Sequence, residues 1–190
     1  MTLALAEVAA EAAGCTKCGL ARGRTQVVFG MGNPQADLMF VGEGPGAEED
    51  KQGLPFVGRS GKLLDRLMAE EMGLTRDLCY IANVVKCRPP DNRDPKPEEI
   101  DACRPWLEQQ VKLIAPKVIV TLGNFSSKLL LDTKTGITKL RGQSYPMGNM
   151  ISTSAVVIPT YHPAAILRGG GLQEAQMRSD LVRARMAMTR

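Results

Sequence analysis

The sequence is poor in aromatic residues and has no long hydrophobic run. Phenylalanine, tyrosine and tryptophan make up 4% of its 190 residues, while alanine, leucine and valine are frequent, which suits an α/β protein. No apolar stretch approaches the roughly eighteen residues that a membrane-spanning helix needs. Residues 1–13 are apolar but contain Glu7, Glu11 and no basic residue, unlike a secretory signal. We therefore expect a cytoplasmic protein, folded as one domain over residues 1–190.

Cysteines are few, and without an export signal the five of them do not indicate a disulfide framework. Cys15 and Cys18 form a CxxC motif, whereas Cys87 and Cys103 flank the proline-rich loop RPPDNRDPKPEE. Four such thiolates suit either a tetrahedral zinc ion or an iron–sulfur cluster, and the spacing does not choose between them. A redox pair at the CxxC motif is the weaker alternative. Cys79 lies within a strand pattern, which favours a small core residue.

Short apolar runs alternate with amphipathic segments along the chain. Strands are expected at 37–41, 79–85, 117–122 and 155–159, and helices at 60–72, 97–114, 124–131 and 172–188. This alternation predicts an α/β fold, a three-layer αβα sandwich with a four-stranded, mostly parallel central sheet.

Several polar residues follow the predicted strands directly. Gly42 and Glu43 come after the first strand, Asn83 lies near the end of the second, and His162, the only histidine, follows the last. Because ligands of open α/β sheets bind outside the carboxyl ends of the strands, these segments are expected to converge on one site. The turn GEGPG resembles a phosphate loop, yet the carboxylates in and beside it would repel a phosphate. Its glycines therefore serve another ligand.

Basic side chains outnumber acidic ones in residues 124–190, although the net charge of the whole chain is only +4. This asymmetry is compatible with a polyanionic partner. Charge alone nevertheless favours the simpler interpretation of solvated helix faces.

Together the motifs GEGPGAEEDKQGLPFVGRSGKLLD, YIANVVKCRPPDNRDPKPEEIDACRPWL, PKVIVTLG and YHPAAILR resemble family 4 uracil-DNA glycosylases, the iron–sulfur members of their superfamily. The resemblance runs from about Cys15 to about Arg168. It implies a monomer that acts on uracil-containing DNA. It also implies a 4Fe–4S cluster on Cys15, Cys18, Cys87 and Cys103, with no metal in the chemistry.

The resemblance also assigns roles to individual residues. Phe56 would stack on a uracil turned out of the helix, and Asn83 would read its polar edge. His162 would donate to uracil O2, where negative charge grows as the glycosidic bond breaks. Glu43 would orient the attacking water or oppose the positive charge of the sugar. The aspartate that better-known members of the superfamily carry in this loop is absent, because Gly44 stands in its place.

The remaining assignments concern the edges of the site and the DNA. Gly42 and Gly44 would let the backbone approach the base, and Glu49 would close off its C5 edge against thymine. Glu48 and Asp50 are expected to belong to a solvated loop. In HPAAILR, Ile166 or Leu167 would wedge into the base stack and Arg168 would meet a phosphate. Further candidate phosphate contacts are Arg59, Lys62, Lys86 and Arg88.

Three alternatives stay open. A related branch of the superfamily attaches covalently to the abasic sugar through a loop histidine, but the segment between Cys87 and Cys103 contains no histidine. A non-catalytic, metal-containing DNA-binding module and a redox iron–sulfur carrier are the others. The chain shows no evident second-cofactor motif, which disfavours a redox carrier.

Overall fold

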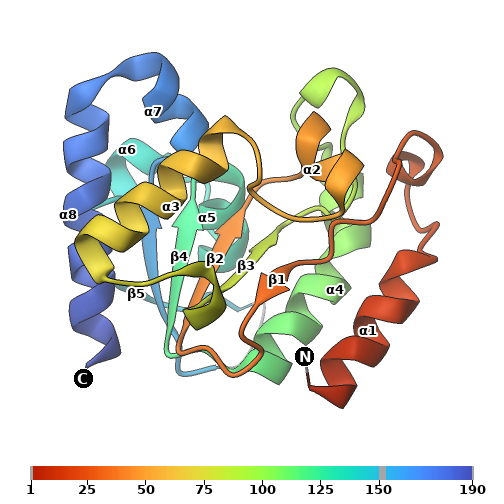
Figure 1. The fold of residues 1–190 in the computed structure, drawn as a ribbon, viewed down its shortest axis with the longest axis horizontal. Coiled ribbons are helices and arrows are strands. Elements are labelled where there is room, and N and C mark those ends of the chain that lie inside the picture. The colour runs from red at the N-terminus through yellow and green to blue at the C-terminus, as the bar shows by residue number, and fades with distance from the viewer. Residues whose placement is uncertain (1, 150–152, 190) are drawn as a thin grey trace.

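The computed structural model describes residues 2–149 and 153–189 as a three-layer αβα arrangement (Figure 1). Its strands are β1 (Met31–Gly32), β2 (Leu38–Gly42), β3 (Tyr80–Asn83), β4 (Val118–Leu122), β5 (Tyr145–Pro146) and β6 (Val156–Thr160). Its α-helices are α1 (Leu3–Ala13), α2 (Ala47–Gln52), α3 (Arg59–Met72), α4 (Pro97–Ile114), α5 (Asn124–Leu131), α6 (Ile137–Leu140), α7 (Pro163–Gly169) and α8 (Gly171–Met188). Short 3₁₀ turns lie at Gly19–Arg22 (η1), Arg76–Leu78 (η2) and Pro90–Asn92 (η3).

The described sheet has six strands in the order β1-β3-β2-β4-β6-β5. The four inner strands are parallel, as predicted, and every residue of β2, β3 and β4 is buried. Strands covered on both faces are expected to be apolar throughout rather than alternating. Four strands were predicted, but the described sheet has six, because β1 and β5 each add a short antiparallel strand at an edge.

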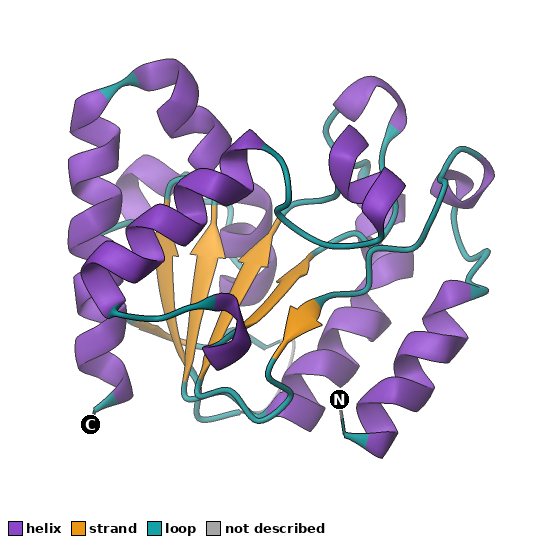
Figure 2. Cartoon of the chain, viewed as in Figure 1, coloured by secondary structure: helices purple, strands orange, loops and turns teal. Residues whose placement is uncertain are grey.

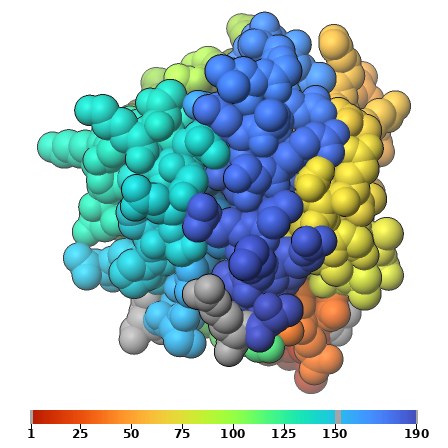
Figure 3. Space-filling model, turned by 90° about the vertical axis from the view of Figure 1, so that its left-hand side faces the viewer, coloured from red at the N-terminus to blue at the C-terminus, as the bar shows by residue number. Residues whose placement is uncertain are grey.

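Helices cover both faces of the sheet and form two separate cores. On one face α1, α4 and α5 bury residues such as Leu5, Leu107 and Leu130 against the sheet. On the other face α3, α7 and α8 bury Leu64, Ile166 and Leu181. Figure 3 shows α8 crossing the middle of one side of the molecule, next to α3. The expected three-layer architecture is therefore confirmed.

The inner strands all point toward one end of the molecule, where α2 and α7 lie (Figure 2). Gly42 and Asn83 are paired at the last position of β2 and β3, and β4 and β6 finish beside them at Leu122 and Thr160. The loops that follow these strands therefore meet at one rim of the sheet. None of the described helices is both long and apolar enough to cross a membrane.

Candidate active site at the strand ends

Gly42, Asn83 and Phe56 meet at the rim because Gly42 has no side chain. A Cβ atom on Gly42 would lie 2.4 Å from Oδ1 of Asn83 and 2.5 Å from Cζ of Phe56. Even the far edge of an aromatic ring cannot be approached so closely without something moving. Glycine at the end of β2 is thus what allows the amide of Asn83 and the ring of Phe56 to sit together.

Asn83 is buried, with 1% of its surface exposed, and its Oδ1 atom has no hydrogen-bond partner among the residues that the structure describes. Leaving a buried acceptor unsatisfied is costly, and such atoms are rare in native proteins. An asparagine amide offers one acceptor and two donors within a single plane. The unpaired oxygen can therefore accept a hydrogen bond from a ligand that carries a donor.

The ring of Phe56 lies against the imidazole of His162, with ring centroids 5.6 Å apart and planes tilted by 30°. Phe56 belongs to the loop between α2 and α3 and is buried, whereas His162 follows β6. Two segments more than a hundred positions apart in sequence therefore contribute neighbouring rings. Together with Asn83 they bring the three sequence-predicted side chains into one cluster.

His162 caps the first turn of α7, and its Nδ1 accepts a hydrogen bond of 3.1 Å from the Ala164 amide. Burial, reinforced by the positive charge of Arg168, lowers the pKa of His162 to about 4, although Glu49 acts in the opposite direction. The imidazole is therefore neutral near pH 7, with its remaining proton on Nε2. Gly123, after β4, makes room for it, because a Cβ there would lie 3.0 Å from the His162 Cβ.

Glu43 follows Gly42 and is half-buried. Desolvation, with a smaller contribution from the charge of Asp94, raises the pKa of Glu43 to about 7. A carboxyl group whose pKa lies near the working pH is suited to accept or orient a proton. Its main-chain oxygen accepts from the Val85 amide at 3.0 Å, which ties the loop to the chain beyond β3.

The other acidic residues of this segment, Glu48, Glu49 and Asp50, lie on α2 rather than in a loop. Glu49 accepts from the amides of Val57 and Gly58, at 3.0 and 2.9 Å, and from Gly46 at the start of α2. It therefore joins α2 to the loop that carries Phe56. Glu48 is exposed, as expected, but Asp50 is not part of a solvated loop. Asp50 is 4% exposed and accepts from the Thr25 amide at 2.9 Å, so that prediction was wrong.

Gly44 lies against the segment that follows β3, since a Cβ on Gly44 would come within 2.7 Å of the Val85 side chain. It is half-buried beside Glu43. The first and second strand exits are thus in contact through both Gly42 and Gly44.

The segment HPAAILR forms α7, which the sequence pattern did not predict as a helix. Ile166 is 4% exposed and belongs to the core beneath α7, whereas Leu167 is 44% exposed and Arg168 is exposed beside it. Of the two residues considered for a wedge, only Leu167 is exposed. The helix closes at Gly170, whose φ of 90° favours glycine.

Most candidate phosphate contacts lie at the surface, but one does not. Arg59 and Lys62 are exposed and Arg88 is partly exposed. Lys86 is only 1% exposed, and its ammonium group donates to the main-chain oxygen of Asn83 at 2.8 Å and to the side chain of Gln110. Lys86 therefore cannot contact a phosphate, and that expectation was wrong.

Four of the five cysteines line one cavity between α1, α4 and the chain after β3; these are Cys15, Cys18, Cys87 and Cys103. Across residues 2–149 and 153–189, however, no three potential ligands are grouped closely enough to hold a single metal ion. A multi-iron cluster is larger than one ion and holds its thiolates farther apart.

The donors around this cavity fit such a group. The Lys86 amide donates to the Cys103 sulfur at 3.2 Å, and Arg24 donates to the Cys87 sulfur at 3.5 Å. The indole N–H of Trp106, which also lines the cavity, is buried and has no partner in the described part of the chain. N–H groups that donate to cysteine sulfur are a means by which proteins tune the reduction potential of an iron–sulfur cluster. Cys79 is buried away from them against Met68, as expected of a core residue.

Two contributors to the site were missed by sequence reasoning. Gly123 makes space for His162, and Arg76 binds the loop that carries Phe56. Gly123 is the last residue of the motif PKVIVTLG. A glycine directly after a predicted strand was the signal that could have identified it. Nothing in the local pattern around Arg76 indicated its contact, because its partners lie about twenty positions earlier in the chain.

Comparison with known protein families assigns the chain to a superfamily. Residues 29–184, which include the whole sheet, match the family model described as the uracil DNA glycosylase superfamily.

Curated relatives narrow the assignment. The chain is 48% identical over 174 residues to the type-4 uracil-DNA glycosylase of Sulfurisphaera tokodaii, an alignment covering 90% of this chain and 79% of that protein. It is 50% identical over 155 residues to the type-4 enzyme of Thermotoga maritima, covering 81% and 78%. For that of Archaeoglobus fulgidus the identity is 44% over 174 residues, covering 90% and 86%. The chain thus belongs to the uracil-DNA glycosylase superfamily and, within it, to the type-4 family.

Proposed function

We propose that this protein hydrolyses the N-glycosidic bond of uracil in DNA, acting as a monomer on an extruded nucleotide and leaving an abasic site. The observation that carries the proposal is the buried, unpartnered Oδ1 atom of Asn83 at the end of β3. Printed names of the relatives, type-4 uracil-DNA glycosylase, support the substrate and the reaction.

Base selection follows from the amide of Asn83. Its Oδ1 would accept from uracil N3–H, and its Nδ2 would donate to O4. Cytosine carries an acceptor at N3 and a donor at the exocyclic position, so both contacts would be mispaired. A site built on hydrogen bonds rejects an analogue that cannot make them by about 10⁴ to 10⁵. The face of Phe56 would hold the plane of the base by stacking.

Bond cleavage places negative charge on the leaving uracil and positive charge on the sugar. The neutral His162 has its free N–H on Nε2, because Nδ1 is engaged by the Ala164 amide. This N–H would donate to uracil O2 as charge develops there, an effect typically of about 100- to 1000-fold in rate. The ionised form of Glu43 would orient the attacking water or stabilise the sugar cation. Amides of Gly42 and Gly44 would approach the O2 side of the base.

Two peripheral roles complete the proposal. Glu49, held by three amides of neighbouring segments, would close off the C5 edge and exclude the methyl group of thymine. Leu167, the exposed large apolar residue of α7, would fill the gap in the base stack, and Arg168 would contact a phosphate.

We also propose that Cys15, Cys18, Cys87 and Cys103 hold a 4Fe–4S cluster. The shared cavity and its N–H donors support this assignment. Such a cluster would join the N-terminal segment, the chain after β3 and α4. No step of the excision chemistry described above passes through it.

The direct test is incubation with an oligonucleotide that contains one uracil, followed by alkali to cut any abasic site. The wild-type protein is expected to give one cut at the uracil, and His162→Ser is expected to slow excision about 100-fold or more. Denaturing gels of the untreated reaction would reveal a covalent protein–DNA adduct. DNA binding without an abasic product, or an adduct in place of free product, would contradict the proposal.

A further inference from the structure

Phe56 has an unusual main-chain conformation for an aromatic residue. Its φ is 54°, in the left-handed region that residues with a Cβ rarely adopt. Such a conformation persists only where the surroundings impose it, and it is often found where a functional side chain must be aimed. The direction of the Phe56 ring toward His162 and Gly42 therefore depends on whatever holds this backbone in place.

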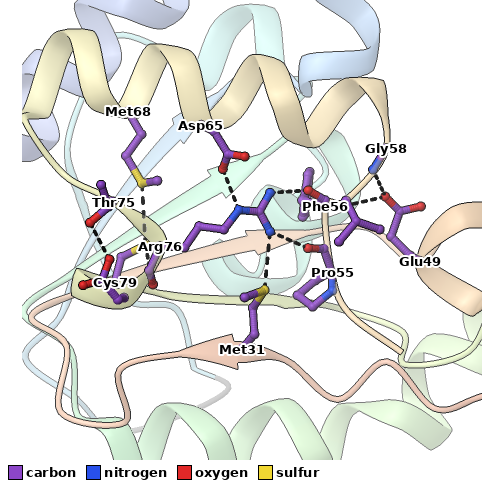
Figure 4. A network of polar contacts seen from close by, with 12 residues as sticks. Met31, Glu49, Pro55, Phe56, Gly58, Asp65, Met68, Thr75, Arg76 and Cys79 are labelled. Carbon is purple, nitrogen blue, oxygen red and sulfur yellow. Dashed lines mark hydrogen bonds and ion pairs between the residues drawn. The ribbon is translucent and has the colours of Figure 1, made fainter. Parts of the chain in front are cut away.

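The guanidinium group of Arg76 contacts the main chain at Phe56 from one side (Figure 4). Its Nη1 donates to the main-chain oxygen of Pro55 at 2.9 Å, and its Nη2 donates to the main-chain oxygen of Phe56. Its Nε donates to the carboxylate of Asp65 on α3 at 2.6 Å. One planar group thus binds two consecutive carbonyls of the strained turn and is itself fixed by a third bond.

The other side of the turn is closed by α3 and Glu49. A Cβ on Gly61 would lie 1.6 Å from the Phe56 oxygen, so α3 packs directly against this carbonyl. Glu49 accepts from the amides of Val57 and Gly58. Arg76 holds the carbonyls of the turn while Glu49 holds its amides, and the ring between them has little freedom to move.

We propose that Arg76 is a positioning residue for uracil recognition, because its bonds to the Pro55 and Phe56 carbonyls aim the Phe56 ring at the base. This inference rests on the proposed function. Arg76 lies in η2, before β3, and does not belong to the cluster of Gly42, Asn83 and His162. Lysine cannot replace it, because a single ammonium lacks the planar fork that reaches two carbonyls and a carboxylate together.

The test is a double-mutant cycle on excision kinetics with Arg76→Lys and Phe56→Ala. Arg76→Lys alone is expected to lower kcat/KM for a uracil oligonucleotide roughly 10- to 100-fold, as small misplacements of a substrate-contacting group do. In the Phe56→Ala background the same change should cost less than about twofold, because the ring it aims is gone. A purely structural role would cost the same factor in both backgrounds, and that result would overturn the inference.

Two further variants keep the test decisive. Arg178→Lys is the matched control, since Arg178 binds Glu70, Glu71 and Glu174 between α3 and α8, away from the site. It should lower Tm while leaving kcat/KM within about twofold. If Arg76→Lys does not fold, Asp65→Asn loosens the same guanidinium, and its smaller loss should also vanish with Phe56→Ala. If the wild type excises no uracil, the proposed function fails; if it does but the effects are additive, only this inference fails.

Discussion

At the scale of single residues, the site depends on which polar atoms are satisfied. The Nδ1 atom of His162 is paired with a main-chain amide, which fixes the imidazole as a donor. The Oδ1 atom of Asn83 is not paired, which leaves it ready to accept. Burial raises the pKa of Glu43 to about 7. The pairing of these side chains and the pKa of Glu43 depend on neighbouring residues that can be substituted.

The pH dependence of excision should report Glu43. If its ionised form is required, kcat/KM rises with pH through about 7, the pKa of this carboxyl. Removing the nearby charge with Asp94→Asn should move the midpoint of the profile to lower pH, because that charge raises the pKa of Glu43. Asp91→Asn, in the same loop, is the control that should leave the midpoint in place. A profile flat between pH 5 and 8, or unmoved by Asp94→Asn, would remove Glu43 from the chemistry.

The stability of the fold should change with the same group. The folded-state pKa of Glu43 lies above its ordinary value of 4.5, so its contribution to stability is complete below pH 4.5 and is lost as pH rises through about 7. Glu43→Gln should therefore stabilise the protein relative to wild type at pH 8 and have little effect at pH 4. Urea unfolding at the two pH values measures this difference. Equal effects at both pH values would contradict the assignment.

At the scale of elements, the ends of β2 and β3 define the site through one glycine. Gly42→Ala would place a methyl group 2.4 Å from the Asn83 oxygen and 2.5 Å from the Phe56 ring, so one of them must move. We expect a roughly 10- to 100-fold loss of kcat/KM in the uracil-excision assay. Gly23→Ala is the control, because nothing lies within 4 Å of a Cβ there. Retention of kcat/KM within twofold by Gly42→Ala would show that the two side chains do not share this space.

The inner elements were predictable because each follows from a local pattern. Helices α4 and α5 have the predicted bounds, and β2, β4 and β6 begin and end one residue from the expected positions at most. Edge strands β1 and β5 pair over two residues each, which is too short for any periodicity to show. Helix α1, capped by Thr2, was not predicted from the apolar first residues.

Only part of the site was predictable from the sequence, because several of its contacts join segments that are distant in the chain. Asn83 and Gly42 could be placed because strand ends and family motifs both point to them. The roles of Arg76, Asp50 and Lys86 depend on contacts with distant segments: Pro55, Thr25 and Gln110 respectively. A charged residue whose partners lie far away in the chain looks, in sequence, like any surface charge. Their positions therefore had to come from the structure.

At the scale of the whole molecule, Lys86 links the cysteine cavity to the candidate active site. Its ammonium group binds the main-chain oxygen of Asn83, and its amide binds the sulfur of Cys103. Its carbonyl accepts from the Val28 amide at 2.8 Å. Loss of the proposed cluster should thus loosen both the N-terminal segment and Asn83.

The cluster proposal makes a prediction at this scale. The purified protein is expected to absorb in the visible region and to contain iron and acid-labile sulfide. Cys103→Ser should lose that absorbance and lower Tm by several degrees, because three separated segments are no longer joined. Cys79→Ala, which changes a buried cysteine outside the cavity, should keep the absorbance. Bound zinc in place of iron, or unchanged iron in Cys103→Ser, would contradict the ligand set.

The central claim is that the buried amide of Asn83 selects uracil, and one measurement tests it most directly. Excision rates of uracil and cytosine from otherwise identical oligonucleotides are compared for wild type, Asn83→Asp and the control Asn33→Asp, whose Oδ1 accepts a local amide at 2.9 Å. A carboxylate offers acceptors only, so it matches one position and repels one position of either base. The account predicts that the ratio of uracil to cytosine excision falls at least about 100-fold in Asn83→Asp alone. An unchanged ratio would contradict it.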